Sequence, residues 1–128
     1  MNERSLMNVE AFDRWLEAYG RAWINGDPQA ALRLFASTAQ YYETPFDRPL
    51  VGHEEIRVYW AESVALARHD VRFSYELLSY EGGLGLAHWQ TSFSKAPGRV
   101  RVELDGMLYA QFDKHGRCTI FREWWHER

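Results

Sequence analysis

VRVELDGMLYAQF, residues 100–112, is the stretch that decides the fold. Apolar residues or glycine occupy every second position from Val100 to Phe112, and mostly polar residues lie between them. This alternation is typical of a β-strand with two unlike faces. Lys114-His115-Gly116 has turn composition, so residues 118–126 (CTIFREWWH) are predicted to fold back as a second strand. We expect this long hairpin to form the floor of a pocket.

Two more strands are predicted before the hairpin. Val71 to Leu77 alternates in the same way, and so does Leu84 to Ser94. Gly82-Gly83 and Ala96-Pro97-Gly98 supply the turns that join them. The second half of the chain is therefore predicted to be a four-stranded antiparallel meander.

The first half has helical periodicity. Val9 to Ile24 carries an apolar stripe at spacings of three and four. A second helix is predicted from the Asp27 cap to about Ala36, and a third from Gly52, with Leu66 facing inward, to a stop at His69-Asp70. A short strand, Gln40 to Thr44, lies between them.

Helices followed by a meander indicate an α+β class and a single domain over residues 1–128. We expect a cone-shaped α+β barrel, in which three helices pack into a strongly bent mixed or antiparallel sheet that is open at one end.

Composition narrows the possible partners. Aromatic residues make up 16 % of the chain, which suits a lined apolar cavity. The net charge is −3 without a basic stripe, which argues against nucleic-acid binding. Cys118 is the single cysteine and the five histidines lack metal-pair spacing, so we expect no metal and no cofactor. We find no apolar run of membrane-spanning or signal-peptide length and expect a cytoplasmic protein.

Four short motifs carry a family resemblance that covers nearly the whole chain. They are Ala22-Trp23-x-x-Gly26-Asp27 with Leu34-Phe35, Tyr42-Glu43-x-Pro45-Phe46, Gly52-x-x-x-Ile56, and Gly116-Arg117 with Arg122-Glu123-Trp124-Trp125. In this order the chain resembles the nuclear-transport-factor-2-like superfamily and, within it, the SnoaL-like proteins. The resemblance implies the cone fold with a pocket, and it leaves the reaction open, because the superfamily includes isomerases, cyclases, epoxide hydrolases, dehydratases and non-enzymatic binders.

Glu123 is the first candidate catalytic residue. It alternates with Phe121 and Trp125 onto the face that the resemblance places toward the pocket. A carboxyl group among aromatic residues is partly desolvated, which raises its pKa and favours acid–base chemistry. The alternative is a structural carboxylate bonded to a Trp or Tyr across the cone.

Glu43 and Tyr19 are the other two candidates. Their positions are similar to the proton-shuttling carboxylate and the oxyanion-binding tyrosine of the ketosteroid isomerases, a distant branch of the superfamily. The chain departs from that pattern at Leu108, where the isomerases are expected to carry a protonated acid, while Asp105 faces away by alternation. Tyr19 could instead be a core tyrosine, and Glu43 a rim charge beside Arg48.

Aromatic and apolar residues on the inward faces are the predicted ligand contacts. They are Trp15, Trp23, Phe46, His53, Trp60, Trp89, Leu108, Phe121 and Trp125. We expect a small apolar ligand and a cofactor-independent isomerase, cyclase, hydrolase or hydratase, with a non-catalytic binding or accessory domain as the alternative. Whether the protein is an enzyme, and on which substrate, stays open at this stage.

The outward face of the sheet is predicted to form a homodimer interface. By alternation it carries Met107, Tyr109, Cys118, Ile120 and Trp124. Exposed together, these residues would make a larger apolar patch than a monomer normally tolerates.

Overall fold

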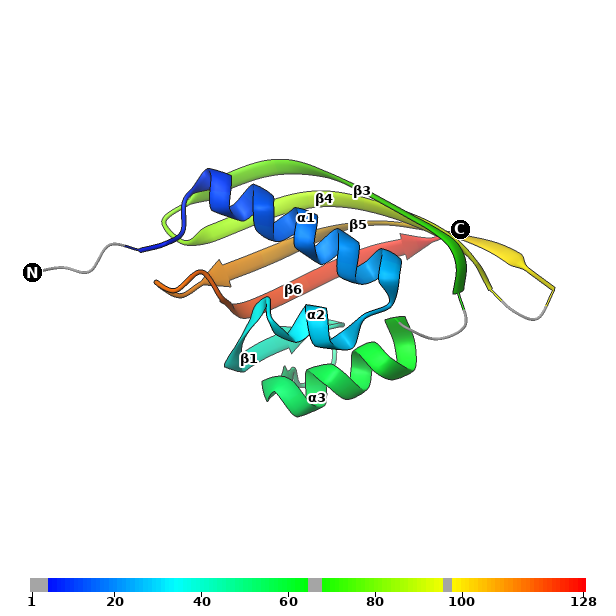
Figure 1. Cartoon of the computed structure of the whole chain (residues 1–128), viewed down its shortest axis with the longest axis horizontal. Coiled ribbons are helices and arrows are strands. Elements are labelled where there is room, and N and C mark those ends of the chain that lie inside the picture. The colour runs from blue at the N-terminus through cyan, green and yellow to red at the C-terminus, as the bar shows by residue number, and fades with distance from the viewer. Residues whose placement is uncertain (1–4, 65–67, 96–97) are drawn as a thin grey trace, which may run out of the picture.

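The computed structural model describes residues 5–64, 68–95 and 98–128. It contains three α-helices, a π-helical turn and six strands (Figure 1). In chain order these are α1 (Val9–Asn25), α2 (Pro28–Leu32), β1 (Phe35–Tyr42), β2 (Leu50–Val51), α3 (Gly52–Tyr59), the π-turn η1 (Trp60–Val64), β3 (Arg68–Glu81), β4 (Leu84–Lys95), β5 (Val100–Phe112) and β6 (Cys118–Glu127).

The strands form one strongly curved, open mixed sheet in the order β2-β1-β6-β5-β4-β3. The long strands β3 to β6 pair antiparallel in an unbroken meander. β1 returns to pair parallel with β6 and antiparallel with β2. This architecture confirms the predicted α+β cone.

Helix α1 lies across one face of the long strands, as Figure 1 shows. Its start is capped by Asn8, whose side chain accepts from the Ala11 amide, and its end by Gly26 in the left-handed conformation (φ 56°). Its apolar stripe is buried, from Phe12 to Trp23.

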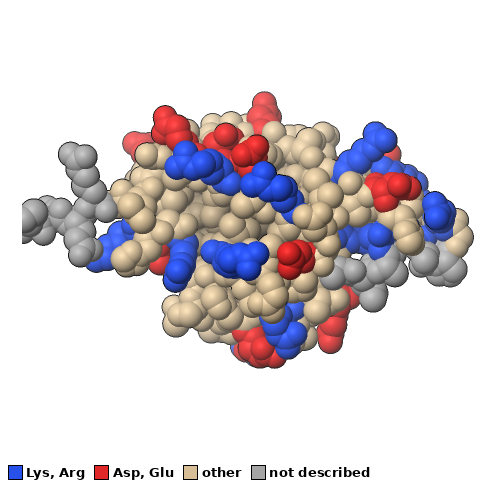
Figure 2. Space-filling view, viewed as in Figure 1, with Lys and Arg blue, Asp and Glu red and all other residues tan. Residues whose placement is uncertain are grey.

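Acidic and basic side chains are interspersed over the face of the molecule seen in Figure 2.

The second helix is shorter than predicted. It ends at Leu32, and Phe35 already belongs to β1. The reason is tertiary: the Leu34 carbonyl accepts from the amide of Cys118 at 3.0 Å and from the Trp15 indole at 3.0 Å. Pairing with the edge of β6 therefore places this segment in the sheet, although its sequence has helical periodicity.

The third helix also ends earlier than expected. After Tyr59 the described residues form the π-turn Trp60–Val64, and His69 and Asp70, predicted to stop the helix, lie in β3. Asp70 has a positive φ of 52° within a register shift between β3 and β4. Leu66 and the Ala96-Pro97 part of the predicted turn lie outside the described residues.

Cys118 does not lie on the outward face. A register shift between β5 and β6 pairs it with Phe112, and its side chain is fully buried in the core. The irregularity exchanges the two faces for this one residue, which simple alternation cannot anticipate.

Candidate functional site

Glu123 is a buried carboxyl group on the core-facing side of the sheet. It lies on β6 between Phe121 and Trp125, opposite Leu108 of β5. Only 3 % of the residue is exposed. Glu123 therefore lies on the inward face of the sheet, as alternation predicted.

Two tyrosine hydroxyl groups donate to this carboxyl group. Tyr19, from α1, reaches Oε2 at 3.3 Å, and Tyr41, from β1, reaches Oε1 at 3.2 Å. Both bonds are long for a hydroxyl donor. Both tyrosines are fully buried, so three polar side chains from α1, β1 and β6 meet in an aromatic interior.

The surroundings shift the pKa values of all three groups upward. Burial raises the pKa of Glu123 to about 8, while the Tyr41 and Tyr19 hydroxyl groups lower it less and the charge of Glu43 raises it further. Burial, and then the charge of Glu123, hold the pKa values of Tyr19 and Tyr41 well above their usual range. At neutral pH this site therefore favours a protonated Glu123 and two neutral phenols.

A cleft of about 660 Å³ gives access to Glu123. One wall is the segment 43–46, where the chain leaves β1, and the other consists of β5 and β6. β1 pairs with β6 only as far as Tyr42 and Arg122, so the edge of β6 is open beyond that point. The cleft lies at this open edge, and both Glu43 and Glu123 line it.

The structure thus brings together the three candidate catalytic residues. Tyr19 contacts Glu123 directly, and Glu43 is close enough to raise the pKa of Glu123 by its charge. Arg48, which offered another partner for Glu43, forms its ion pair with Glu55 at 3.7 Å. Asp105 also lines the cleft, but its carboxylate faces the outward side of the sheet, where it accepts from Gln90 at 2.8 Å and lies 2.8 Å from His88.

The predicted ligand contacts divide into three groups. Phe46 and Trp125 line the cleft, with Phe46 92 % exposed on its rim. His53 lies farther away, with Nε2 2.8 Å from the Phe35 carbonyl oxygen. The remaining six are buried in the aromatic core around Tyr19: Trp15, Trp23, Trp60, Trp89, Leu108 and Phe121.

Two tyrosines at the site were not among the predicted residues. Tyr41 donates to Glu123, and Tyr59 lies with its ring centroid 5.4 Å from that of Tyr41. Burial, then the charges of Glu123 and Glu43, raise the pKa of Tyr59 above its usual range. A signal for Tyr41 was available, because it has the same parity as Glu43 on a β-prone stretch.

Within residues 5–64, 68–95 and 98–128, no group of three or more His, Cys, Asp or Glu side chains is arranged to hold a metal ion. In the same part of the chain, no helix combines the length and apolar character needed to span a membrane. The side chains that line the cleft can supply a neutral carboxylic acid, Glu123, and a second carboxyl group, Glu43. The phenols of Tyr19 and Tyr41 lie buried behind Glu123.

Comparison with known proteins agrees with this geometry at the level of the fold. The structure is similar to a solved structure reported for SalBIII, an epoxide hydrolase/cyclase-like enzyme in pyran ring formation in the polyether salinomycin. The TM-score is 0.78 at 19 % sequence identity, over 94 % of this chain and 95 % of the other. A search of curated proteins finds no match. The family profile described as the SnoaL-like domain matches residues 14–121, and the chain therefore belongs to the SnoaL-like family.

Proposed function

We propose that this protein is a cofactor-independent acid–base enzyme of the isomerase, cyclase or hydrolase type, acting on a small apolar molecule. The observation that carries the proposal is Glu123, a carboxyl group that is 3 % exposed, bonded by two phenols, and open to a cleft that it shares with Glu43. Burial of a carboxyl group that could be replaced by an apolar residue is typical of a functional site.

The two carboxyl groups have different surroundings, which suits different roles. Glu123 is buried with a pKa of about 8, so at neutral pH it is largely protonated and able to donate. Glu43 lies at the partly exposed end of β1 and is the candidate base. An acid and a base on one cleft can remove a proton at one position of a ligand and supply one at another.

Leu108 does not exclude this chemistry. It cannot donate, but it is paired with Glu123 on the neighbouring strand. The acidic donor expected on the long strand by resemblance to the isomerases is thus supplied, in this proposal, from β6. Tyr19 and Tyr41 hold that carboxyl group in place and can stabilise a developing negative charge.

The similarity to the structure reported for an epoxide hydrolase/cyclase-like enzyme supports testing epoxides and ketones first. Ligands would be selected by thermal shift from a panel of aromatic and terpenoid ketones and epoxides. Conversion would then be followed by mass spectrometry in D₂O, which labels proton transfer, and in ¹⁸O-water, which labels hydrolysis.

Glu43→Gln and Glu123→Gln should each lower turnover by about 10²–10⁴ while the thermal shift persists, because general acid–base help has that typical magnitude. Glu81→Gln, at the exposed end of β3, is the matched control and should retain full activity. Unchanged turnover in both site variants contradicts the proposed mechanism. A ligand that binds without being converted supports the alternative, a non-catalytic binding domain.

A further inference from the structure

The interior holds hydrogen-bond donors that have no acceptor. Among the described residues, the buried side-chain polar atoms without a partner are the indole Nε1 of Trp23, Trp60 and Trp89 and the Nε and Nη1 of Arg68. All of these atoms are donors. A buried donor left unpaired costs roughly 1–3 kcal/mol, so a group of them calls for an acceptor.

These donors belong to one cluster centred on Trp23. The Trp23 ring centroid lies 6.1 Å from those of Trp60 and Trp89, and the Arg68 guanidinium lies 4.8 Å above the Trp23 ring. The Trp23 and Trp60 indoles are near enough to Tyr19 and Tyr41 to lower the pKa values of those tyrosines slightly, without completing a hydrogen bond. The Trp89 indole and the Arg68 guanidinium have no tyrosine hydroxyl group placed in this way among the described residues.

Arg68 is a partly buried cation. Its guanidinium is held between the rings of Trp23 and Phe93, and Nη2 donates to the Trp23 carbonyl at 2.8 Å. No ion pair joins it to a carboxylate in the part of the chain that the structure describes. Burial lowers the pKa of Arg68 to about 10, so the group still carries its charge at neutral pH. A partly buried charge of this kind is normally paired.

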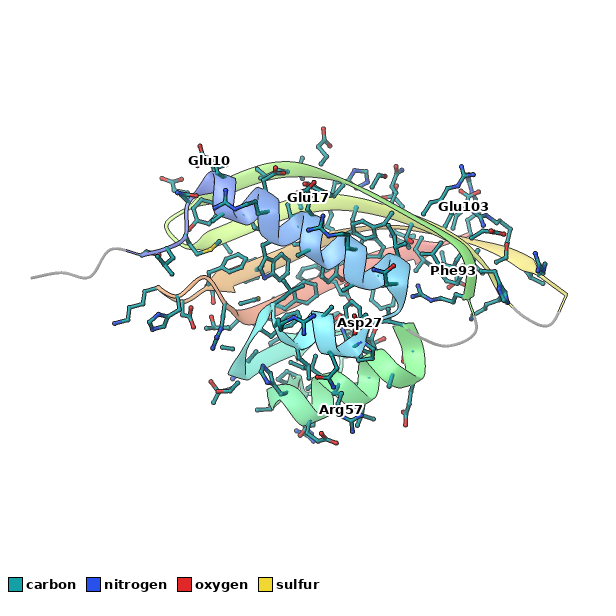
Figure 3. All side chains as sticks on the ribbon, viewed as in Figure 1. Glu10, Glu17, Asp27, Arg57, Phe93 and Glu103 are labelled. Atoms are coloured by element: carbon teal, nitrogen blue, oxygen red, sulfur yellow. The ribbon has the colours of Figure 1, made fainter. Side chains whose placement is uncertain are left out.

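Arg68 is not one of the residues that line the cleft of the acid–base site. Its neighbour Phe93, labelled in Figure 3, lies near the start of β3. Phe93 is four residues from Trp89 along β4, and Trp89 shares a row of the sheet with Trp125, which is two residues from Glu123. At about 3.3 Å per residue, Phe93 lies roughly 20 Å along the strand direction from the row of Glu123. The side chains between the two sites are nevertheless in contact, because Arg68 packs on Trp23, Trp23 on Trp60, and Trp60 on Tyr19, which donates to Glu123.

The helix beside the cluster is also irregular. The π-turn η1 begins at Trp60, where α3 ends. The irregular backbone, the unpaired indoles and Arg68 therefore coincide in one region, between α1, η1, the start of β3 and the middle of β4.

We propose that Arg68, assisted by the Trp89 indole, binds the carboxylate of an apolar ligand. A carboxylate supplies both the missing charge and the missing acceptor oxygens. The identity of this ligand as the substrate rests on the proposed function, whereas its binding does not, so the two can be tested separately.

The test compares decanoate with decanol, which share an apolar chain and differ in the charged head group. Binding would be measured by calorimetry to the wild type and to Glu123→Gln, in which the proposed acid is absent and the Arg68 site is intact. In both proteins decanoate should bind at least about tenfold more tightly than decanol. If Glu123→Gln loses turnover and retains the preference for decanoate, then carboxylate binding at Arg68 is independent of the acid–base chemistry.

Arg68→Gln should abolish the preference for decanoate and leave the affinity for decanol nearly unchanged. Arg72→Gln is the matched control, because Arg72 lies on the same strand on the opposite, exposed face and should keep the preference. If Arg68→Gln does not fold, the wild-type comparison of the two probes decides alone. Equal affinities for the two probes, binding of neither, or a preference that survives in Arg68→Gln overturns the proposal.

Discussion

Replacing Glu123 with Gln should remove a large pH dependence from the stability of the protein. Glutamine has the shape of a protonated glutamate and cannot ionise, so it mimics the neutral form that the interior favours. One of the Tyr19 and Tyr41 hydroxyl groups can still donate to its amide oxygen, and the other can accept from its NH2 group. The comparison therefore isolates the free energy of ionising one buried group.

The magnitude follows from the pKa of Glu123. Burial raises this pKa from 4.5 to about 8, and each pKa unit corresponds to about 1.36 kcal/mol. Below pH 4.5 the group is protonated in both the native and the unfolded states. Between about pH 4.5 and pH 8 the unfolded chain has released the proton while the native state keeps it, so stability falls by about 1.4 kcal/mol per pH unit. Over the whole window the wild type loses about 5 kcal/mol.

The assay is urea unfolding followed by tryptophan fluorescence, for both proteins, at intervals of one pH unit across this window. The free energies of unfolding should be similar at the acidic end, and Glu123→Gln should become the more stable protein as the pH rises. Glu81→Gln, which changes an exposed carboxylate on β3, should follow the wild type. A difference that does not change with pH would refute the reasoning. A wild type that gains stability relative to the variant would show that the two phenols favour the ionised form more than burial opposes it.

Two further predictions concern packing and assembly. Gly106→Ala should lower the free energy of unfolding by about 1–3 kcal/mol, because a Cβ there would collide with the Trp124 carbonyl oxygen and lie 2.7 Å from the Trp89 ring. A urea titration measures this, and an unchanged unfolding midpoint would contradict it. We propose a homodimer through the outward sheet face, where Met107 and Trp124 are paired and 38 % and 47 % exposed. Light scattering should show a dimer for the wild type and a monomer for Trp124→Glu, and equal masses would count against it.

Local periodicity was sufficient to predict the elements that bury one face. The alternation of residues 100–112 and the stripe of the first helix depend only on neighbours in sequence, and both are reproduced in β5 and α1. The inward direction of Glu123 follows from the same rule, because the register between β5 and β6 is regular from Leu104 to Gln111. Alternation is reliable where pairing is unbroken.

The sequence-based predictions were wrong where strand pairing is non-local or irregular. Phe35 has helical spacing with its predecessors, yet the parallel pairing of β1 with β6 places it in a strand. His69 and Asp70 adjoin a shift between β3 and β4, and Cys118 lies beside one between β5 and β6. These features depend on strands that are distant in sequence. Tyr41 was missed for a related reason, since its donation to Glu123 spans 82 positions and requires the β1–β6 register.

The energetic cost of Glu123 argues that the chain retains this residue for a reason other than folding. A loss of about 5 kcal/mol across the pH window is comparable to the whole stability of a small domain, about 5–15 kcal/mol. A leucine at this position, with phenylalanine in place of Tyr19 and Tyr41, would bury more apolar surface and carry no such cost. Two buried hydroxyl groups from different elements are nevertheless directed at this carboxyl group, and its cleft contains a second carboxyl group, that of Glu43. Expensive polar groups that are arranged in this way are most often found where a protein binds or converts a ligand, so Glu123 is where the search for a substrate should begin.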